Sequence, residues 1–271
     1  MSTAPETNAL LDQCRTGSKE ERYQAALALG QAGEAAAIPV LLPLLEAEDS
    51  SLRSAATYAL GRLGEFCPDI VGPALARRLA DPDDLVRDDA AEALGDLQYQ
   101  PARVALERVL REDWHATPRA AAAAALGELG DPRACQALIA ALFDEDGPVR
   151  GYAATSLGLL GDPSALPAVQ RRLAAEEWQG AKIDLARAAM RLGDDSGFDT
   201  LMAVTDQLDD DLVINWYNSI DELLWRKTPG IVIDRAAELD RRLMERNAPK
   251  LRERLAELCQ RRDENAPSSA P

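Results

Sequence analysis

Few residues of this sequence have the types and spacing that catalysis or metal binding requires. His115 is the single histidine, so any histidine-dependent nucleophile or histidine metal site would have to rely on it. The four cysteines lie far apart and form no Cys-x-x-Cys pair, which argues against a zinc knuckle and a disulfide framework: Cys14, Cys67, Cys135 and Cys259. No phosphate-binding glycine loop or nucleophile elbow occurs. We therefore expect no catalytic residue, no metal site and no cofactor.

The charged residues favour a different chemistry, which is the binding of another macromolecule. The formal net charge is −16, although residues 226–271 hold 11 Lys or Arg against 8 Asp or Glu. The acidic excess thus belongs to residues 1–225, where a negative potential repels phosphate backbones and anionic lipids. The N-terminus does not resemble a secretion signal, and no run of 18 apolar residues occurs. We expect a cytoplasmic protein whose partner is a protein rather than nucleic acid or a membrane.

A recurring motif indicates which elements position these charges. In residues 148–163 an Ala-Ala pair is followed by Leu-Gly, and copies recur along the chain. The glycine that serves as marker falls at intervals of 31, 34, 32 and 31 residues, and Met190 fills its slot 32 residues later: Gly30, Gly61, Gly95, Gly127 and Gly158. Such a period is typical of stacked helical hairpins. The sequence predicts an all-α solenoid of about six to seven repeats.

Each repeat is predicted to contain a first helix and a second helix that carries the marker. The first helices are expected over residues 36–46, 69–80, 102–112, 132–143 and 164–176. Positions five, four and one before the marker stay small or apolar, as in Ala122, Ala123 and Leu126. This spacing places them against neighbouring helices. Ser18 and Glu21 form a capping box that begins the helix ending near Gly30.

The position eight residues before the marker is cationic in every copy: Arg22, Arg53, Arg87, Arg119, Arg150 and Lys182. Acids commonly precede it in the turn, as at Asp49, Asp83, Asp113 and Asp146. We interpret this pattern as a ladder of arginines bound to turn carboxylates across the stack. A structural role is favoured over ligand binding, because a charge needed for binding would not have to recur in every repeat.

Three positions of the second helix vary freely, and they lie seven and three residues before the marker and one after it. Their spacing of four places them in one stripe on the helix surface. If the second helices line the inner curve, the stripes form one surface, acidic in its middle and basic at its C-terminal end. The alternative is that they are merely solvated faces. The predicted partner-binding residues are Tyr58, Arg62, Asp88, Glu92, Asp96, Glu128, Tyr152, Thr155, Arg187 and Arg191.

The repeat pattern decays after Asp194, where the helices become longer and more aromatic around Trp216, Tyr217 and Trp225. Atypical end repeats commonly shield the last apolar face of an array. The predicted organisation is an N-terminal helix (1–17), a solenoid (18–226) with an atypical capping repeat (195–226), charged C-terminal helices (227–262) and a disordered tail (263–271).

The motif Val-Arg-x-x-Ala-Ala-x-x-Leu-Gly-x-Leu-Gly-Asp-Pro in residues 149–163, with looser copies in 86–97 and 119–132, resembles the HEAT-like repeat of the phycobilisome lyase type. That resemblance implies the solenoid fold. Some such proteins attach or detach a tetrapyrrole on an antenna protein, but no motif here marks a bilin site. Deoxyhypusine hydroxylase holds two irons with His-Glu pairs, whereas Ala116 follows His115. Related DNA glycosylases present a basic groove, which the acidic repeats lack.

Three possibilities remain after these exclusions, and one of them, a specialised chaperone for a metalloenzyme, differs from the leading hypothesis only in its partner. The leading hypothesis is a non-catalytic adaptor, scaffold or assembly factor that binds a partner protein along the inner curve of the solenoid. The alternative is a phycobilin lyase-like chromophore transfer factor. The sequence leaves the oligomeric state open.

Overall fold

The computed structural model describes residues 4–204, 216, 218–220, 235–245, 249, 252–253, 255–257 and 259–260. The chain divides into two compact units, residues 1–165 and 166–271. Within the described ranges the regular structure is entirely helical, and no strand occurs. The prediction of an all-α solenoid is confirmed, whereas the predicted domain boundaries stay predictions.

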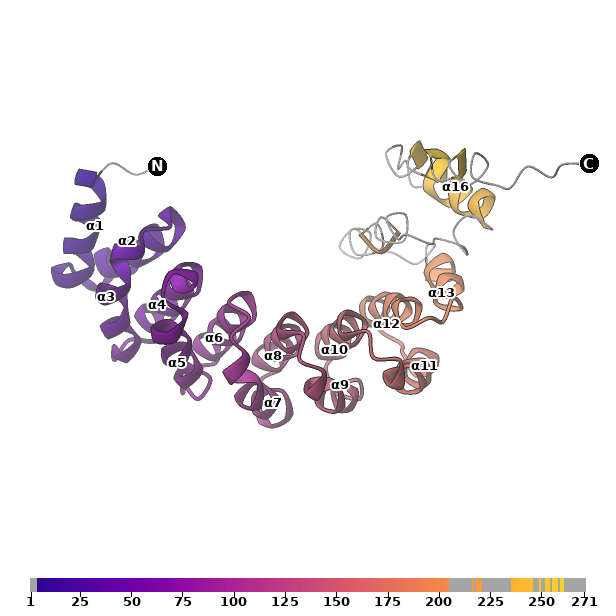
Figure 1. Ribbon diagram of the computed structural model, residues 1–271, viewed down its shortest axis with the longest axis horizontal. Helices are drawn as coiled ribbons and strands as arrows, with labels where there is room; N and C mark the ends of the chain where they lie inside the picture. Colours follow the sequence, from indigo (N-terminus) through magenta and orange to yellow (C-terminus); the bar gives the residue numbers. More distant parts are fainter. Residues whose placement is uncertain are drawn as a thin grey trace, which may run out of the picture. The chain divides into compact units, whose positions relative to one another are not determined.

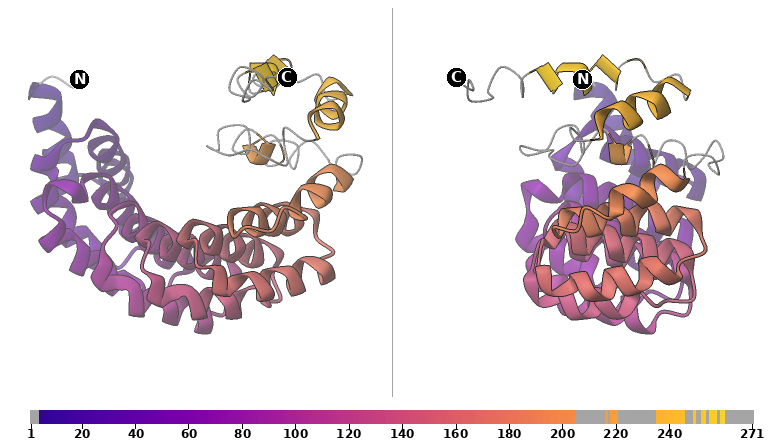
Figure 2. Two further views of the ribbon diagram at one scale, coloured as in Figure 1. Left: turned by 45° about the vertical axis from the view of Figure 1, so that its right-hand side comes forward. Right: turned by 90° about the vertical axis from the view of Figure 1, so that its right-hand side faces the viewer.

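The first unit is a stack of helical hairpins in two layers (Figures 1 and 2). Helix α1 (Ala4–Thr16) opens the unit and packs against the first helix of the inner layer. The inner layer lies on the inside of the bend of this unit, and each of its helices packs against the next: α2 (Lys19–Ala32), α4 (Ser50–Leu63), α6 (Asp84–Asp96), α8 (Ala116–Leu129) and α10 (Gly147–Leu160). The outer layer consists of α3 (Ile38–Leu41), α5 (Pro68–Arg78), α7 (Arg103–Glu112) and α9 (Cys135–Ala141).

The outer helices are shorter than the sequence predicted. A 3₁₀ turn precedes α7 at Gln100–Ala102 and α9 at Pro132–Ala134. The helix expected over residues 36–46 is broken into Ala35–Ala37, α3 and Leu42–Glu46. Pro43 lies in the last of these pieces and has no amide N–H to donate to the preceding turn, which disfavours a continuous α-helix there.

The marker glycines allow the inner helices to approach one another closely. A Cβ atom on Gly61 would lie 2.6 Å from the Cβ of Ala93 on α6. A Cβ on Gly30 would lie 2.7 Å from the Cα of Ala59 on α4. Real Cβ atoms do not pack at such distances, so backbone contact between successive inner helices requires glycine at these positions. The recurrence of the marker therefore reflects a requirement of helix packing.

Three of the ladder arginines bind an aspartate of the following repeat through two parallel hydrogen bonds. The shortest N–O distances are 2.7 Å for Arg53–Asp81, 2.6 Å for Arg87–Asp113 and 2.8 Å for Arg119–Asp144. In each case the other guanidinium nitrogen donates to carbonyls of the turn before its own helix, such as those of Ala47 and Glu48 for Arg53. The pairs are largely buried, and they join successive turns along one edge of the unit.

The other aspartates that the sequence assigned to this ladder cap helices and do not bind the ladder arginines, so that part of the interpretation was wrong. Asp49, Asp83 and Asp146 each accept a backbone N–H of their own inner helix and serve as its N-cap. An aspartate at this position satisfies an amide that has no partner within the helix. The sequence could not separate the two roles because both kinds of aspartate lie in the same short turn.

The remaining ladder cations have individual surroundings. Arg22 donates to the carbonyl of Cys14 at 3.2 Å, and Arg150 donates to the carbonyls of Asp144 and Glu145. Lys182 lies half-buried in the second unit.

The capping box has both of its predicted bonds, since the Ser18 hydroxyl accepts from the Glu21 amide and the Glu21 carboxylate accepts from the Ser18 amide.

The second unit contains α11 (Leu166–Ala175), α12 (Gln179–Arg191), α13 (Gly197–Ala203) and α16 (Ala236–Glu245). Its core is built around Phe198 and Trp216, both fully buried. The indole N–H of Trp216 donates to the carbonyl of Leu201 at 2.8 Å, so this tryptophan is a core residue. Tyr217, Trp225 and the predicted tail lie outside the described residues.

Two further observations concern the described residues only. None of their helices has the length and apolar character that crossing a bilayer requires. Their His, Cys, Asp and Glu side chains also form no group of three or more that could hold a metal ion.

Candidate partner-binding surface

The inner layer of the first unit carries eight of the ten residues that the sequence predicted to bind a partner. Tyr58 and Arg62 come from α4, and both are exposed to solvent. Helix α6 supplies three acids, α8 supplies Glu128, and α10 supplies Tyr152 and Thr155. The spacing of four residues places the side chains of one helix above one another, and the packing of each inner helix against the next brings the rows together.

The acids of α6 form the middle of this surface. Asp88, Glu92 and Asp96 follow one another at one-turn intervals, and the carboxylate of Glu128 reaches across from α8. It occupies the space that a side chain on Gly95 would fill, so the marker glycine of this repeat also makes room for the acid. We call these four residues the acidic face.

The acidic face is electrostatically unfavourable. Burial, together with the charges of Asp89 and Glu92, raises the pKa of Asp88 from 3.8 to about 6. Burial and the neighbouring Asp96 and Glu92 also raise the pKa of the Glu128 carboxyl. Both groups are therefore easier to protonate than ordinary carboxyls, and both would be stabilised in the charged form by an added cation.

The carboxylates of the arginine ladder differ from those of the acidic face in their hydrogen-bond partners. Ladder carboxylates such as Asp81 and Asp113 each accept two hydrogen bonds from one guanidinium group. Within the described part of the chain, no residue of the acidic face has a hydrogen bond or ion pair to a cation. In the first unit the ladder carboxylates are thus bound directly by arginine, whereas the carboxylates of the acidic face form no ion pair, although Arg62 borders the face.

Sequence reasoning missed Asp89, which borders the acidic face. Its carboxylate accepts a 2.5 Å hydrogen bond from the Ser54 hydroxyl of α4, while burial raises its pKa. Asp89 also lines a small hollow of about 60 Å³, together with Tyr58, Arg62, Glu92 and Asp96. The sequence does contain a signal for this residue, because Asp89 directly follows Asp88. Asp89 nevertheless lies outside the spacing of four residues that defines the stripe.

The two ends of the predicted surface differ. Tyr152 is 50% exposed on α10, and Leu159 of the same helix is 53% exposed. Arg187 and Arg191 lie on α12 in the second unit, and the Arg187 side chain is only 14% exposed and binds Asp184 at 2.8 Å. This arginine is thus less available to solvent than expected. Continuity of the surface between the two units stays a prediction.

Comparison with known proteins identifies the repeats that carry this surface. A family model described as HEAT repeats matches residues 7–95, 101–190 and 138–217. The chain belongs to the HEAT-repeat family. Comparison with curated proteins finds no significant match.

Solved structures similar to this HEAT-repeat protein include several kinds of solenoid. The complex of CpcE and CpcF of phycocyanin lyase from Nostoc sp. PCC7120 is 21% identical with a TM-score of 0.58, over 90% of this chain and 96% of that one. Kap121p bound to Nup53p is 16% identical with a TM-score of 0.58, over 84% of this chain and 28% of that one. A designed armadillo repeat protein is 17% identical with a TM-score of 0.53, over 69% and 100%. At these identities the likeness concerns the fold alone.

His115, the single histidine of this HEAT-repeat protein, precedes α8 as its N-terminal flanking residue. Its imidazole packs edge to face on Trp114 with ring centroids 4.6 Å apart, and its Nδ1 lies 3.6 Å from a carboxylate oxygen of Asp84. The side chain is 44% exposed. The His115 backbone N–H donates to the Asp113 carboxylate at 3.0 Å.

Proposed function

We propose that this protein is a non-catalytic scaffold, adaptor or assembly factor that binds a partner protein along the inner layer of its repeats. One observation carries the proposal: no cation of the described residues forms an ion pair with the four carboxylates of the acidic face, whereas the buried ladder carboxylates Asp81, Asp113 and Asp144 are each bound by arginine. A cationic partner segment would relieve the repulsion that raises the pKa of Asp88. One fold can serve many different functions, so the proposal depends on the inner surface and its charges and not on the fold.

The inner layer also has the features of a surface that recognises a protein. Aromatic side chains are enriched in the cores of protein interfaces, and Tyr58 and Tyr152 flank the acidic face at 38% and 50% exposure. Carboxylates steer a basic partner and fix its register, while the aromatic side chains contribute apolar contact area. We infer that the partner presents lysine or arginine side chains together with apolar ones.

Charge reversal tests this function. We expect the combined Asp88→Lys, Glu92→Lys and Asp96→Lys substitutions to abolish capture of the partner from an extract of the native host, as measured by affinity capture and mass spectrometry. The matched control reverses three exposed acids that lie away from the acidic face, Glu48, Glu65 and Asp69. Equal capture by both variants, at unchanged helicity, would contradict the proposal.

Chromophore transfer remains the alternative function, suggested by the resemblance of the repeats to those of phycobilin lyases. It predicts that the purified chain changes the visible absorbance of a tetrapyrrole on titration. A flat titration together with capture of a protein partner would favour the scaffold.

A further inference from the structure

Helix α8 contributes only methyl groups to the middle of the inner layer. Ala120 and Ala124 stand seven and three residues before the marker glycine, at the positions that Asp88 and Glu92 hold on α6. Together with Ala121 they form a low strip along α8, which we call the alanine floor. Because an alanine side chain is a single methyl group, another helix can approach α8 closely along this strip.

Helix α8 lies directly between α6 and α10, so the alanine floor has one neighbouring helix on each side (Figure 1). A Cβ atom on Gly95 of α6 would lie 2.8 Å from the Cα of Ala125 on α8. A Cβ atom on Gly127 of α8 would lie 2.9 Å from the Cα of Ser156 on α10. The backbones of the three helices are thus in close contact, and their inner faces are contiguous.

The two sides of the alanine floor differ in chemistry. On the α6 side stand Asp88, Glu92 and Asp96, with which no cation of the described residues forms an ion pair. On the α10 side lie Tyr152 and Leu159, which are about two turns apart on one face of the helix and are 50% and 53% exposed. A partner segment seated on the floor would therefore meet carboxylates along one flank and apolar side chains along the other.

We propose that the alanine floor binds an amphipathic α-helix of the partner protein, with lysine or arginine side chains on the flank that faces α6 and apolar side chains on the flank that faces α10. The floor as a binding site rests on the proposed function, since it specifies which segment of the partner the inner layer binds. The cations would pair with the acids, and the apolar side chains would cover Tyr152 and Leu159. Small residues at the contact allow the two helix axes to approach to about 8 Å.

The inner layer favours a helix over an extended segment. An extended segment leaves its backbone N–H and C=O groups without protein partners unless a sheet edge receives them, and no strand occurs in the ranges that the structure describes. A helix pairs these groups internally. Helix α8 has 14 residues, so a partner helix of about four turns would run the length of the floor.

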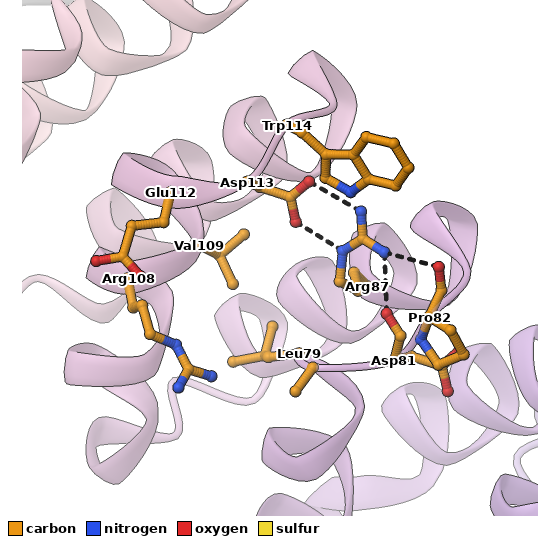
Figure 3. A pocket seen from close by; sticks show the side chains of 10 residues that line it. Leu79, Asp81, Pro82, Arg87, Arg108, Val109, Glu112, Asp113 and Trp114 are labelled. Carbon is orange, nitrogen blue, oxygen red and sulfur yellow. Dashed lines mark hydrogen bonds and ion pairs between the residues drawn. The ribbon is translucent and has the colours of Figure 1, made fainter.

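A larger hollow of the first unit offers a basic helix no comparable surface. It has a volume of about 350 Å³ and lies beside Trp114 on the edge that carries the arginine ladder. The carboxylates that line it belong to Asp81, Glu112 and Asp113, and an arginine binds each of them. Figure 3 shows one such pair, Arg87 with Asp113. These acids are already paired, unlike those of the acidic face.

Designed peptides test the site directly. The probe is a fluorescently labelled helical peptide of about four turns, with leucines along one flank, lysines along the other and alanines between them. We expect saturable binding by fluorescence anisotropy at about 0.15 M salt, where non-specific attraction to the acidic chain is screened. A peptide of the same composition with its leucines and lysines dispersed around the helix should bind at least about threefold more weakly.

A second control peptide has proline in place of its central alanine, which breaks the helix without changing the charge. It should bind at least about tenfold more weakly than the helical probe. Equal binding of the proline peptide would show that an extended segment suffices and would overturn the proposal. Lack of saturable binding of the helical probe at millimolar concentration would overturn it as well.

A bulky side chain on the floor should block the site. We expect Ala124→Trp to weaken binding of the helical probe by about tenfold or more, because the indole would occupy the space of the partner helix. The matched control is Ala140→Trp, at an exposed alanine of the outer helix α9, and its affinity should be unchanged. Circular dichroism verifies that both variants keep their helicity. Equal affinity of the two variants would contradict a helix seated on α8.

The apolar flank is tested by exposed residues whose substitution leaves the core intact. Tyr152→Ser combined with Leu159→Ser should weaken binding of the helical probe by about three- to tenfold. The same double variant should not change the affinity for a peptide that has glutamine in place of every leucine, since that peptide has no apolar flank. An unchanged affinity for the leucine peptide would refute the assignment.

Capture of the partner from an extract separates the alanine floor from the proposed function. We expect both the triple charge reversal of the acidic face and Ala124→Trp to lose the partner, in agreement with the peptide results. Loss in the reversed variant with normal capture by Ala124→Trp would leave the proposed function standing and refute the helix on the floor. Normal capture by the reversed variant would instead refute the proposed function itself.

Discussion

The charged carboxylate of Asp88 is destabilised by burial and by neighbouring acids, so we expect Asp88→Asn to stabilise the folded protein at neutral pH. Asparagine has nearly the shape of aspartate but carries no charge, so it removes both the burial penalty and the repulsion from Asp89 and Glu92 that raise the pKa of Asp88. The gain should appear in the free energy of unfolding without any change in helix content. A gain in stability from removing a charge would be typical of a site kept for binding.

The magnitude and its pH dependence follow from the pKa. A carboxyl group whose pKa is raised on folding holds its proton more tightly in the folded state. Its effect on stability is therefore smallest below about pH 3.8, and stability is lost as the pH rises through about 6. A rise of this size corresponds to about 3 kcal/mol at neutral pH. Solvent screens this half-buried group, so we expect about 1–2 kcal/mol.

Urea denaturation followed by circular dichroism at several pH values measures this effect. Urea is preferred because it adds no ions that would screen the charges. The advantage of Asp88→Asn over the natural protein should be nearly constant above about pH 7, shrink as the pH falls through about 6, and be smallest below about pH 3.8. Glu65→Gln, at an exposed position away from the acidic face, serves as the control and should change little. A destabilised Asp88→Asn variant, or a gain that does not depend on pH, would refute the reasoning.

Three further substitutions test the frame of the protein. Arg119→Ala should lower the free energy of unfolding by about 2 kcal/mol, measured by urea denaturation, because it leaves the largely buried carboxylate of Asp144 without its partner. Gly61→Ala should lower the melting temperature despite the better helix propensity of alanine, because its methyl group would collide with Ala93. A higher melting temperature would show that the two helices separate at no cost. Trp216→Phe should cost about 1–2 kcal/mol in urea denaturation through the lost indole hydrogen bond, and an unchanged value would show that this bond contributes nothing.

Part of the candidate site was predictable because each position of the inner helices keeps a fixed distance in sequence from the marker glycine of its repeat. A side chain at Asp88 or Glu92 faces the same direction relative to the marker as its counterpart in every repeat, so the helical period alone assigns it to the inner layer. The acidity of this layer could also be recognised from residue types. What the period could not reveal is that burial differs along one stripe, which is why the raised pKa of Asp88 and the burial of Arg187 emerged only in three dimensions.

The sequence by itself determined the repeat, its helical hairpins and the positions that remain small, since these depend on contacts that recur locally every 31 to 34 residues. Only the tertiary structure decided the partner of each charge. Asp81 and Asp83 lie two residues apart in one turn, yet the first binds Arg53 of the preceding repeat and the second caps its own helix. Arg78 likewise donates to the carbonyl of Leu45, 33 residues away, only because successive turns lie side by side. Pairing is set by distances between repeats, and a linear order of residues does not contain those distances.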